Sequence, residues 1–546
     1  MTCFAVVDII LQKKNEGDIL KHYKEYIYNI LPCVWYGIIC GSITGAGIFG
    51  FRFAAKKLEH LSEIIYTEAI ESPFAVVGVF AALVAFALLM GFMQKRIPEM
   101  KGGGIPCCEG ILRGVLSFRR TRTVYGTIIG SFISFLCGLP LGSEGPAVIV
   151  GTAIGGLCSG PNGSKSAWSR YVMTGGAAAG FSVATGSPLS AILFALEEIH
   201  KRFTPMLVLT VSMSVLSATY VNRLLCGIFR MSPELFSAHD LPDFELGNVG
   251  YLLLFSVIVA VAVGIFDASL GYFGKFTKKL KKIIPDTVKL IVVFIFTGIL
   301  GFCFSHSVHS GHEIIENILS YGESFGLLFA VLAVRMIMMV LVTDSGATGG
   351  IFVPTLAIGA LVGAIGGRIL VFAGMPQEIF PTVVLLGMCA FIGGTLRAPL
   401  TATVLFIEFT CSCTNLFYVA LVVFVVNFIT AVFNQTPFYD RVLERLEENQ
   451  NKGKTARIVS YRMKVSTDAF VVGKTVRDIM WPHSAVVVSV TRANHNDQDM
   501  DNDGEKKLYD GDTLILRLKL YDEKETLHRL RGLVGEQYQI EEVSSV

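Results

Sequence analysis

Charged residues are scarce in this chain. Only 16% of its 546 residues are Asp, Glu, Lys or Arg, whereas soluble domains carry roughly 25%. Basic residues outnumber acidic ones by only two, so the charge balance gives no indication of a nucleic-acid partner. This composition excludes a disordered chain and an ordinary cytosolic enzyme.

The chain also lacks the cysteine patterns of disulfide-rich or metal-binding proteins. Eleven of its twelve cysteines lie in apolar sequence between Cys33 and Cys413, and none has metal-ligand spacing. Close pairs such as Cys107 and Cys108 do not suit routine disulfides, so we expect buried thiols. No nucleophile–base arrangement stands out either, which argues against an enzyme.

Apolar residues, in contrast, make up 52% of the chain, and the mean hydropathy is +0.58. Fourteen apolar segments follow one another over residues 34–434, several of them shorter than the roughly 20 residues that a span needs. Gly and Pro interrupt many segments, as in transporters whose helices end within the membrane. We predict an all-α polytopic membrane protein. Basic clusters at Arg52–Lys57, Lys201–Arg202 and Lys275–Lys282 are candidate cytoplasmic loops.

An internal repeat supports this architecture. Residues 142–155 and 346–359 share Gly positions and an Ala-Ile-Gly ending, and residues 187–197 and 398–408 share Pro-Leu, a hydroxyl, an Ala and a final Glu. The two offsets, 204 and 211 residues, are nearly equal. Two related halves of inverted topology would place a substrate at their interface near the membrane midplane.

Composition changes after about residue 440, where charged residues and short alternating runs begin. The predicted domains are an N-terminal cytoplasmic or interfacial segment (1–33), a transmembrane domain (34–440, with repeats at about 34–228 and 248–434), a linker (441–456) and a small α+β cytoplasmic domain (457–546).

One carboxylate is isolated within the apolar sequence. Glu144 is the one acidic or basic residue between Arg122 and Lys165, and it lies in Gly142–Pro146 (Gly-Ser-Glu-Gly-Pro) ahead of an apolar helix. A helix start offers free N–H groups that attract anions, and an intramembrane carboxylate is a functional candidate by default. Glu144 could compete with a soluble anion and leave when protonated. A glutamate without a role is the alternative.

Two further glycine-rich helix starts accompany it. In Gly349–Pro354 the amides of Ile351 and Phe352 would point at an ion, and Gly102–Pro106 forms a second turn with exposed amides. Taken singly, the first is equally a helix-packing glycine pair and the second a simple loop. Their conjunction with Glu144 favours an anion site.

Glu197 and Glu198 end another apolar helix. One of them could pair with Lys201 or Arg202 and the other relay protons, or both could be solvated. Glu408 is the repeat partner of Glu197, which favours a structural role for that pair.

These motifs strongly resemble the CLC family of chloride channels and chloride–proton antiporters. The resemblance covers residues 34–445 and rests on Gly102–Pro106 (usually G-S-G-I-P), Gly142–Pro146 (usually G-R-E-G-P), Gly350–Pro354 (G-I-F-x-P) and Tyr439 within Thr436–Tyr439.

The resemblance implies a homodimer in which each subunit has its own anion path. It implies that Glu144 is the external gating glutamate and that Glu198 matches the internal proton glutamate of the antiporter branch. Two carboxylates rather than one favour coupled exchange over a channel. The residues that it assigns to the anion are Gly103, Ile105, Ser143, Gly145, Ile351, Phe352 and Tyr439.

Two positions depart from the family pattern. Gly103 stands where Ser is usual, which removes a hydroxyl and leaves the choice of anion open, fluoride included. Ser143 stands where Arg is usual, which should weaken the local attraction for anions.

Residues 457–546 are similar to the TrkA-C (RCK C-terminal) domain of ion-transport regulators, through Val472–Ile479 and the Gly511-Asp512 pair. The resemblance implies a sensor of a small ligand, with cyclic dinucleotides as a precedent. Gly473–Thr475 is not a phosphate loop, because Asp468 stands where that motif needs Gly. Asp499–Asp510 nearly fits a calcium loop, but its last ligand is Asp and we expect flanking strands, so a solvated hairpin tip is favoured. The expected elements are a strand (458–465), a short helix opened by 472–479, strands at 485–492 and 508–516, and a helix at 523–533.

The prediction is therefore a proton-coupled chloride antiporter in the plasma membrane, with no cofactor, regulated through its C-terminal domain. The alternatives are a passive chloride channel, a fluoride–proton exchanger, and a protein that is chiefly a membrane-bound ligand sensor.

Overall fold

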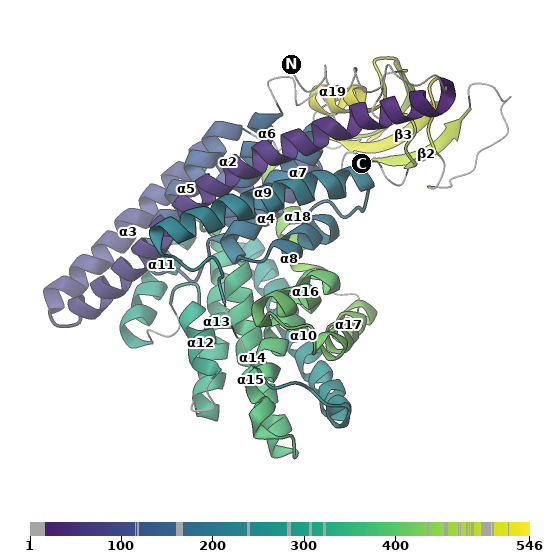
Figure 1. The fold of residues 1–546 in the computed structure, drawn as a ribbon. Coiled ribbons are helices and arrows are strands. Elements are labelled where there is room, and N and C mark those ends of the chain that lie inside the picture. Colours follow the sequence, from purple (N-terminus) through teal and green to yellow (C-terminus); the bar gives the residue numbers. More distant parts are fainter. Residues whose placement is uncertain are drawn as a thin grey trace.

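The computed structural model describes residues 17–545 apart from short gaps. The gaps are residues 115, 117–118, 160–167, 237, 239–240, 281–284, 305–307, 320–323, 434–435, 452–456, 468, 470, 477–478, 480, 482–484, 493–503, 505–506 and 522. Among the described residues, eight helices are long and apolar enough to cross a membrane. The protein is thus a mostly helical membrane protein with a small α+β region at its C-terminus, which lies at one end of the helical bundle (Figure 1).

The helices of the first half are α2 (Gly17–Ala69), α3 (Pro73–Arg96), η1 (Pro98–Met100), α4 (Ile105–Leu112), α5 (Arg120–Leu136), α6 (Glu144–Cys158), α7 (Trp168–Thr185), α8 (Pro188–Phe194), the π-helix η2 (Ala195–Ile199) and α9 (Pro205–Phe229). Those of the second half are η3 (Leu246–Asn248), α10 (Val249–Leu280), α11 (Asp286–Cys303), α12 (His312–Ile318), α13 (Phe325–Ser345), α14 (Phe352–Phe372), η5 (Gln377–Ile379), α15 (Phe380–Leu396), α16 (Pro399–Thr410) and α17 (Leu416–Val432). Several begin on proline, which suits a first helical turn because its missing N–H has no intrahelical acceptor there.

The packing of these helices follows the sequence repeat. In the first half α6 packs on α7, and α2 packs on α7 and α9. In the second half α14 packs on α15, and α10 packs on α15 and α17. α8 and α16, which carry the repeated Pro-Leu motif, pack on each other and so join the two halves.

The N-terminal part differs from the sequence prediction. α2 runs unbroken from Gly17 to Ala69, with Pro32 inside it, so the expected boundary at 33/34 falls within one helix. The predicted loop at Arg52–Lys57 is wrong, because these residues belong to α2. The one predicted at Lys275–Lys282 is wrong over residues 275–280, which belong to α10 (Val249–Leu280). A short apolar run followed by basic residues looked like a span and its loop, whereas α2 extends beyond the apolar run in both directions.

The two repeats hold each other through reciprocal helix caps. The Glu408 carboxylate of α16 accepts hydrogen bonds from the backbone N–H of Leu189 and Ser190 in α8, at 2.7 and 2.8 Å. The Glu197 carboxylate accepts bonds from the N–H of Leu400 and Thr401 in α16, at 3.1 and 2.8 Å. Each glutamate thus satisfies free N–H groups at the start of the other repeat's helix, as the structural role expected for this pair requires.

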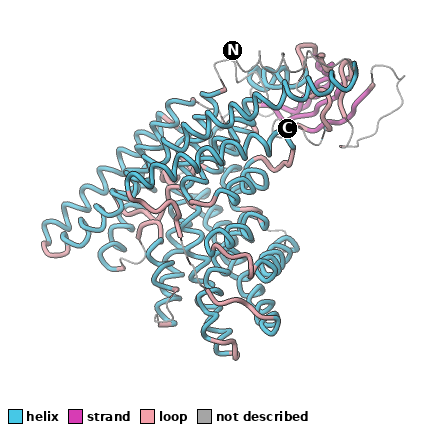
Figure 2. Tube along the Cα trace, viewed as in Figure 1, coloured by secondary structure: helices cyan, strands magenta, loops and turns pink. Residues whose placement is uncertain are grey.

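The C-terminal domain is a four-stranded antiparallel sheet beside one helix, and among the described residues the strands are confined to this region (Figure 2). The strand order is β2-β3-β1-β4, with β1 (Arg457–Lys464), β2 (Val486–Thr491), β3 (Thr513–Leu520), α19 (Glu523–Val534) and β4 (Tyr538–Ser545). Strand β4 was not predicted. Residues 472–475 form turns and isolated bridges rather than the expected helix. The expected linker at 441–456 is helical at first, because α18 (Phe438–Gln450) continues past residue 440.

This domain touches the membrane domain. The Lys474 ammonium lies 5.9 Å from the ring centre of Tyr171, in the first turn of α7. Tyr171 in turn lies against the His200 ring, at 5.7 Å between centres. His200 directly follows η2, the π-helix that carries Glu198.

Candidate functional site: converging helix starts around Glu144

Three glycine-rich loops meet backbone to backbone at the interface of the two repeats. Gly142 and Gly350 exchange two hydrogen bonds, at 2.7 and 2.6 Å, so the two glycine-rich segments of the repeat pair directly. A Cβ on Gly104 would lie 2.0 Å from the carbonyl oxygen of Gly145, and one on Gly145 would lie 1.9 Å from that of Gly103. Since no side chain fits between these backbones, the glycines are required by packing.

The same contacts bring three helix starts together. α4 begins at Ile105, α6 at Glu144 and α14 at Phe352, each directly after one of the three loops. The first N–H groups of a helix have no intrahelical acceptor and carry partial positive charge. The structure therefore gathers the predicted anion-site residues of all three motifs, and the Ile351 side chain lies 3.5 Å from the position that a Gly103 Cβ would occupy.

Phe352 is fixed by neighbouring aromatic rings. Its ring meets Phe181 of α7 edge-on at 4.9 Å and Phe194 of α8 at 6.1 Å. Edge-to-face aromatic pairs are worth about 0.5–1.5 kcal/mol each beyond burial. The first residue of α14 thus packs against α7 and against α8, the helix that directly precedes the Glu198-bearing η2.

Glu144 is buried, with 1% of its surface exposed. Ser143 donates a hydrogen bond to Glu144 Oε1 at 3.2 Å, while Oε2 has no partner among the described residues. The carboxylate folds back over its own loop, because Oε2 lies 2.2 Å from where a Gly142 Cβ would be. The side chain thus rests against a turn of bare backbone, with one oxygen free to bind a proton or to be displaced.

Tyr439 lies on the other side of α4. It is in the first turn of α18, which packs on α4, and its side chain is 1% exposed. Its hydroxyl has no hydrogen-bond partner in the described part of the chain, although buried hydroxyls normally have one. The carboxylates of Glu198, Glu144 and Glu109 all interact with it electrostatically. An unpartnered hydroxyl under the electrostatic influence of these three buried carboxyl groups suits an anion or water ligand.

Glu198 belongs to a buried ionic cluster. It is 3% exposed, and the Lys201 ammonium lies 3.9 Å from its Oε1. Lys201 also pairs with Glu109 and Asp440, each at 2.9 Å. Glu197 turns away to cap α16, so the π-helix η2 sends its two adjacent glutamates to different places. Widened turns of this kind are frequent at functional sites.

Sequence reasoning missed Glu109. It is 1% exposed in α4 and pairs with Arg113 as well as Lys201. The signal was available, because Glu109 is the one charged residue between Lys101 and Arg113 in apolar sequence. The rule that singled out Glu144 also applies to it.

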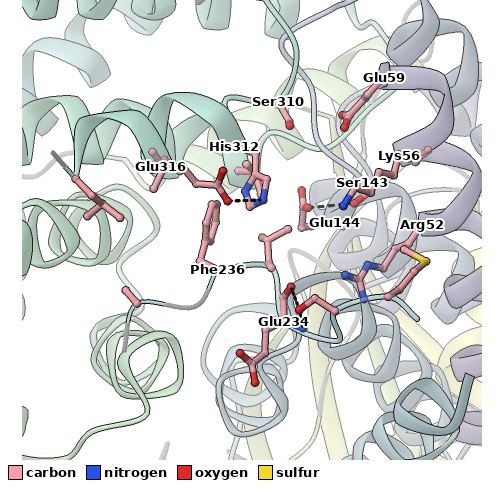
Figure 3. Close-up of a pocket in the computed structure, with 18 of the residues that line it drawn as sticks. Arg52, Lys56, Glu59, Ser143, Glu144, Glu234, Phe236, Ser310, His312 and Glu316 are labelled. Atoms are coloured by element: carbon pink, nitrogen blue, oxygen red, sulfur yellow. Dashed lines mark hydrogen bonds and ion pairs between the residues drawn. The ribbon is translucent and has the colours of Figure 1, made fainter. Parts of the chain in front are cut away.

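A cavity of about 330 Å³ opens in front of Glu144 (Figure 3). Its charged lining comes from α2, from the start of α6, from the segment after α9 and from α12, and it consists of Arg52, Lys56, Glu59, Glu144, Glu234, His312 and Glu316. This "Glu144 cavity" shares no lining residue with the Glu198 cluster. No sequence pattern indicates that Arg52 lies beside Glu144, because the two residues are more than ninety positions apart in the chain. Among the described residues, no group of three or more His, Cys, Asp or Glu side chains could hold a metal ion. Residues 499–503 of the predicted acidic loop lie outside that part.

Paired repeats of broken helices, with helix starts converging on a buried carboxylate, define a membrane transport protein. The chain belongs to the voltage gated chloride channel family, whose sequence profile matches residues 86–431. It is similar to the H(+)/Cl(-) exchange transporter ClcA of Vibrio cholerae serotype O1, with 29% identity over 470 residues that cover 81% of this chain and 95% of the relative.

Solved structures show the same fold. A slow cyanobacterial Cl−/H+ antiporter superposes with a TM-score of 0.70 at 24% identity, covering 77% of this chain and 99% of that protein. A CLC-type fluoride/proton antiporter superposes with a TM-score of 0.61 at 18% identity, covering 74% and 96%. These identities support the fold alone.

Proposed function

We propose that this protein exchanges chloride for protons across a membrane, with Glu144 as the gate and Glu198 as the proton acceptor at the other end of the path. The observation that carries the proposal is the Glu144 carboxylate, which is buried at three converging helix starts with one oxygen unpartnered. The similarity to H(+)/Cl(-) exchange transporters supports it.

The mechanism follows from competition for one position. Deprotonated Glu144 occupies the place that the helix starts offer to an anion. Protonation neutralises the carboxylate and removes its attraction to the helix starts. The side chain then leaves, and an anion enters. Tyr439 holds the anion deeper in the path, and the proton passes between Glu144 and Glu198 through water. Glu198, buried beside Lys201, provides a second proton-binding site.

The test is paired flux in liposomes that hold the purified protein. A chloride gradient is imposed, the voltage is clamped with potassium and valinomycin, and chloride and proton movement are followed together. We expect chloride to drive protons uphill in the wild type. Glu144→Ala should carry chloride without coupled protons, since the gate and the proton carrier are then absent.

Each other outcome has a distinct meaning. Chloride movement without protons in the wild type would make the protein a channel. Coupled proton movement in Glu144→Ala would refute the role of Glu144. Proton coupling to fluoride in preference to chloride would assign the anion differently, as the missing hydroxyl at Gly103 allows.

We further propose that residues 457–546 sense a small ligand, of the cyclic-dinucleotide kind, and regulate transport from the cytoplasmic side of the plasma membrane. The contact between Lys474 and Tyr171 supports this, because it links the domain to the end of the protein that carries Glu198. Removal of residues 457–546 should change the rate of transport and leave coupling intact. Loss of all transport would instead make the sensor the principal part of the protein.

A homodimer with one path in each subunit is proposed from family membership. Cross-linking in lipid membranes tests it, and a monomer that transports fully would contradict the dimer.

A further inference from the structure

An anion that approaches Glu144 through the Glu144 cavity passes both carboxyl and basic side chains. The cavity lining carries four carboxyl groups, those of Glu59, Glu144, Glu234 and Glu316. Burial lowers the pKa of His312, so this imidazole adds no positive charge near neutral pH. An anion that approaches Glu144 through this cavity therefore needs a cation close to the carboxylate.

Arg52 is placed to supply that charge. Its side chain extends from α2 toward the centre of the cavity, where Glu144 lies (Figure 3). One guanidinium nitrogen donates to the carbonyl oxygen of Val183 at 2.7 Å and lies 3.5 Å from that of Pro233. These two carbonyls hold the group in place, and Arg52 and Glu144 interact electrostatically.

No salt bridge neutralises the charge of Arg52 among the described residues. Within the described part of the chain no carboxylate lies within ion-pair distance of its guanidinium, and its hydrogen-bond acceptors are neutral carbonyls. The other basic side chain of the lining, Lys56, is exposed. A half-buried guanidinium acts through a lower dielectric than an exposed ammonium and is screened less by salt.

Ser143 lies in the same lining, directly beside Glu144, and donates an uncharged hydrogen bond to it. We infer that Arg52 is a specificity-determining residue that draws small inorganic anions to the Glu144 site, and so supplies from α2 the positive charge that position 143 lacks. This inference rests on the proposed anion transport.

The experiment measures the initial rate of chloride-driven proton movement in liposomes as a function of chloride concentration. Arg52→Gln should raise the half-saturating chloride concentration on the order of tenfold. Arg52→Lys, which keeps the charge, should stay near the wild type. Lys57→Gln removes the same charge from a neighbouring position on α2 that does not line the cavity, and should leave the half-saturating concentration unchanged.

A charge transfer to position 143 completes the test. Adding Ser143→Arg to Arg52→Gln should restore most of the lost chloride affinity, because the new guanidinium enters the same cavity. Should Arg52→Gln fail to fold, Ser143→Arg alone should lower the half-saturating concentration of the otherwise intact protein.

The outcomes separate this inference from the proposed function. No chloride flux in the wild type removes both. Normal flux with unchanged half-saturation in Arg52→Gln, or equal damage in Arg52→Gln and Arg52→Lys, leaves the transporter standing and overturns the role of Arg52. Failure of Ser143→Arg to improve chloride affinity in either background also overturns it.

Discussion

At the scale of single residues, the backbone conformation of Gly103 limits which side chain can stand at this position. Its φ is +80°, in the region that favours glycine, and the flanking Gly102 and Gly104 share this conformation. A Cβ at 103 would make ordinary contacts, at 3.5 Å from the Gly349 oxygen. Space therefore permits a side chain there, and the backbone conformation opposes one.

We predict that Gly103→Ser and Gly103→Ala both lower the free energy of unfolding by about 1–2 kcal/mol. In each variant a residue with a Cβ must adopt the left-handed φ of position 103, which is strained. The serine variant alone should tighten chloride half-saturation, by roughly 2- to 10-fold, since its hydroxyl adds one hydrogen bond to the anion. Thermal denaturation and anion-competition flux measure the two effects. Equal anion preference in the two variants would exclude position 103 from anion selection.

How far the sequence could predict the site is also decided residue by residue. Glu144 and the three glycine loops were found because each is a local pattern, and the structure brings these loops together. The pairing of Lys201 with Glu198 was expected because the two residues are three positions apart. The contacts of Lys201 with Glu109 and Asp440, and the position of Arg52 beside the Glu144 cavity, join elements far apart in the chain, and no local pattern predicts them. Glu109 was within reach of the lone-carboxylate rule and was overlooked, because it lies between two nearby cations.

At the scale of elements, the π-helix η2 separates two adjacent glutamates. The His200 N–H reaches the Ala195 oxygen at 2.8 Å, which widens the turn. Glu197 then caps α16 and Glu198 enters the ionic cluster. Periodicity predicts a plain helix here, because a widened turn arises from tertiary contacts and not from local propensity. The sequence therefore predicts the two roles, but it does not predict where in the structure each of the two side chains points.

We predict opposite phenotypes for these neighbours. Glu197→Ala leaves the N–H groups at the start of α16 without acceptors and should cost about 1–3 kcal/mol of stability, with coupling retained in the folded protein. Glu408→Ala should do the same at α8, because the caps are reciprocal. Glu198→Ala should lose proton coupling while chloride flux persists.

Denaturation in detergent and paired flux measure the two properties separately. Glu71→Ala, at an exposed turn, is the control and should change neither. Retained coupling in Glu198→Ala, or uncoupling in Glu197→Ala at full stability, would show that the roles are assigned to the wrong glutamates.

At the scale of the whole molecule, the repeat was readable because the same motifs occur twice in the same order. The length of α2 could not be predicted in this way, since a long helix with a polar end resembles a membrane span followed by a loop. The strands of the C-terminal domain follow alternating patterns and were largely predicted, but β4 pairs with β1 across the domain and has weaker alternation. Nothing in the sequence connects Lys474 with Tyr171, which lie about three hundred positions apart.

The proposed regulation by the C-terminal domain would use that contact as its route to Glu198. Lys474 lies over Tyr171, the Tyr171 ring lies against His200, and His200 is held by a 3.0 Å hydrogen bond with Thr174. His200 follows the π-helix, so in the proposed regulation a shift of the domain would reach the turn that positions Glu198. A cation–π contact is worth about 0.5–2 kcal/mol, depending on how far it is removed from solvent, and Tyr171 is buried. This is enough to bias a rate without setting the fold.

We predict that Lys474→Ala and Tyr171→Leu change the rate of exchange in the same direction and by similar factors, with the proton-to-chloride ratio unchanged. Tyr171→Phe keeps the aromatic face and should behave as the wild type. Lys519→Ala, which removes a lysine on β3 that pairs with Tyr521 inside the domain, should have no effect. If Tyr171→Phe and Tyr171→Leu change the rate equally, the aromatic face is not what couples the domain to transport. If a rate change in Lys474→Ala persists undiminished in the Tyr171→Leu background, the lysine acts elsewhere, because two partners of one contact cannot add their effects.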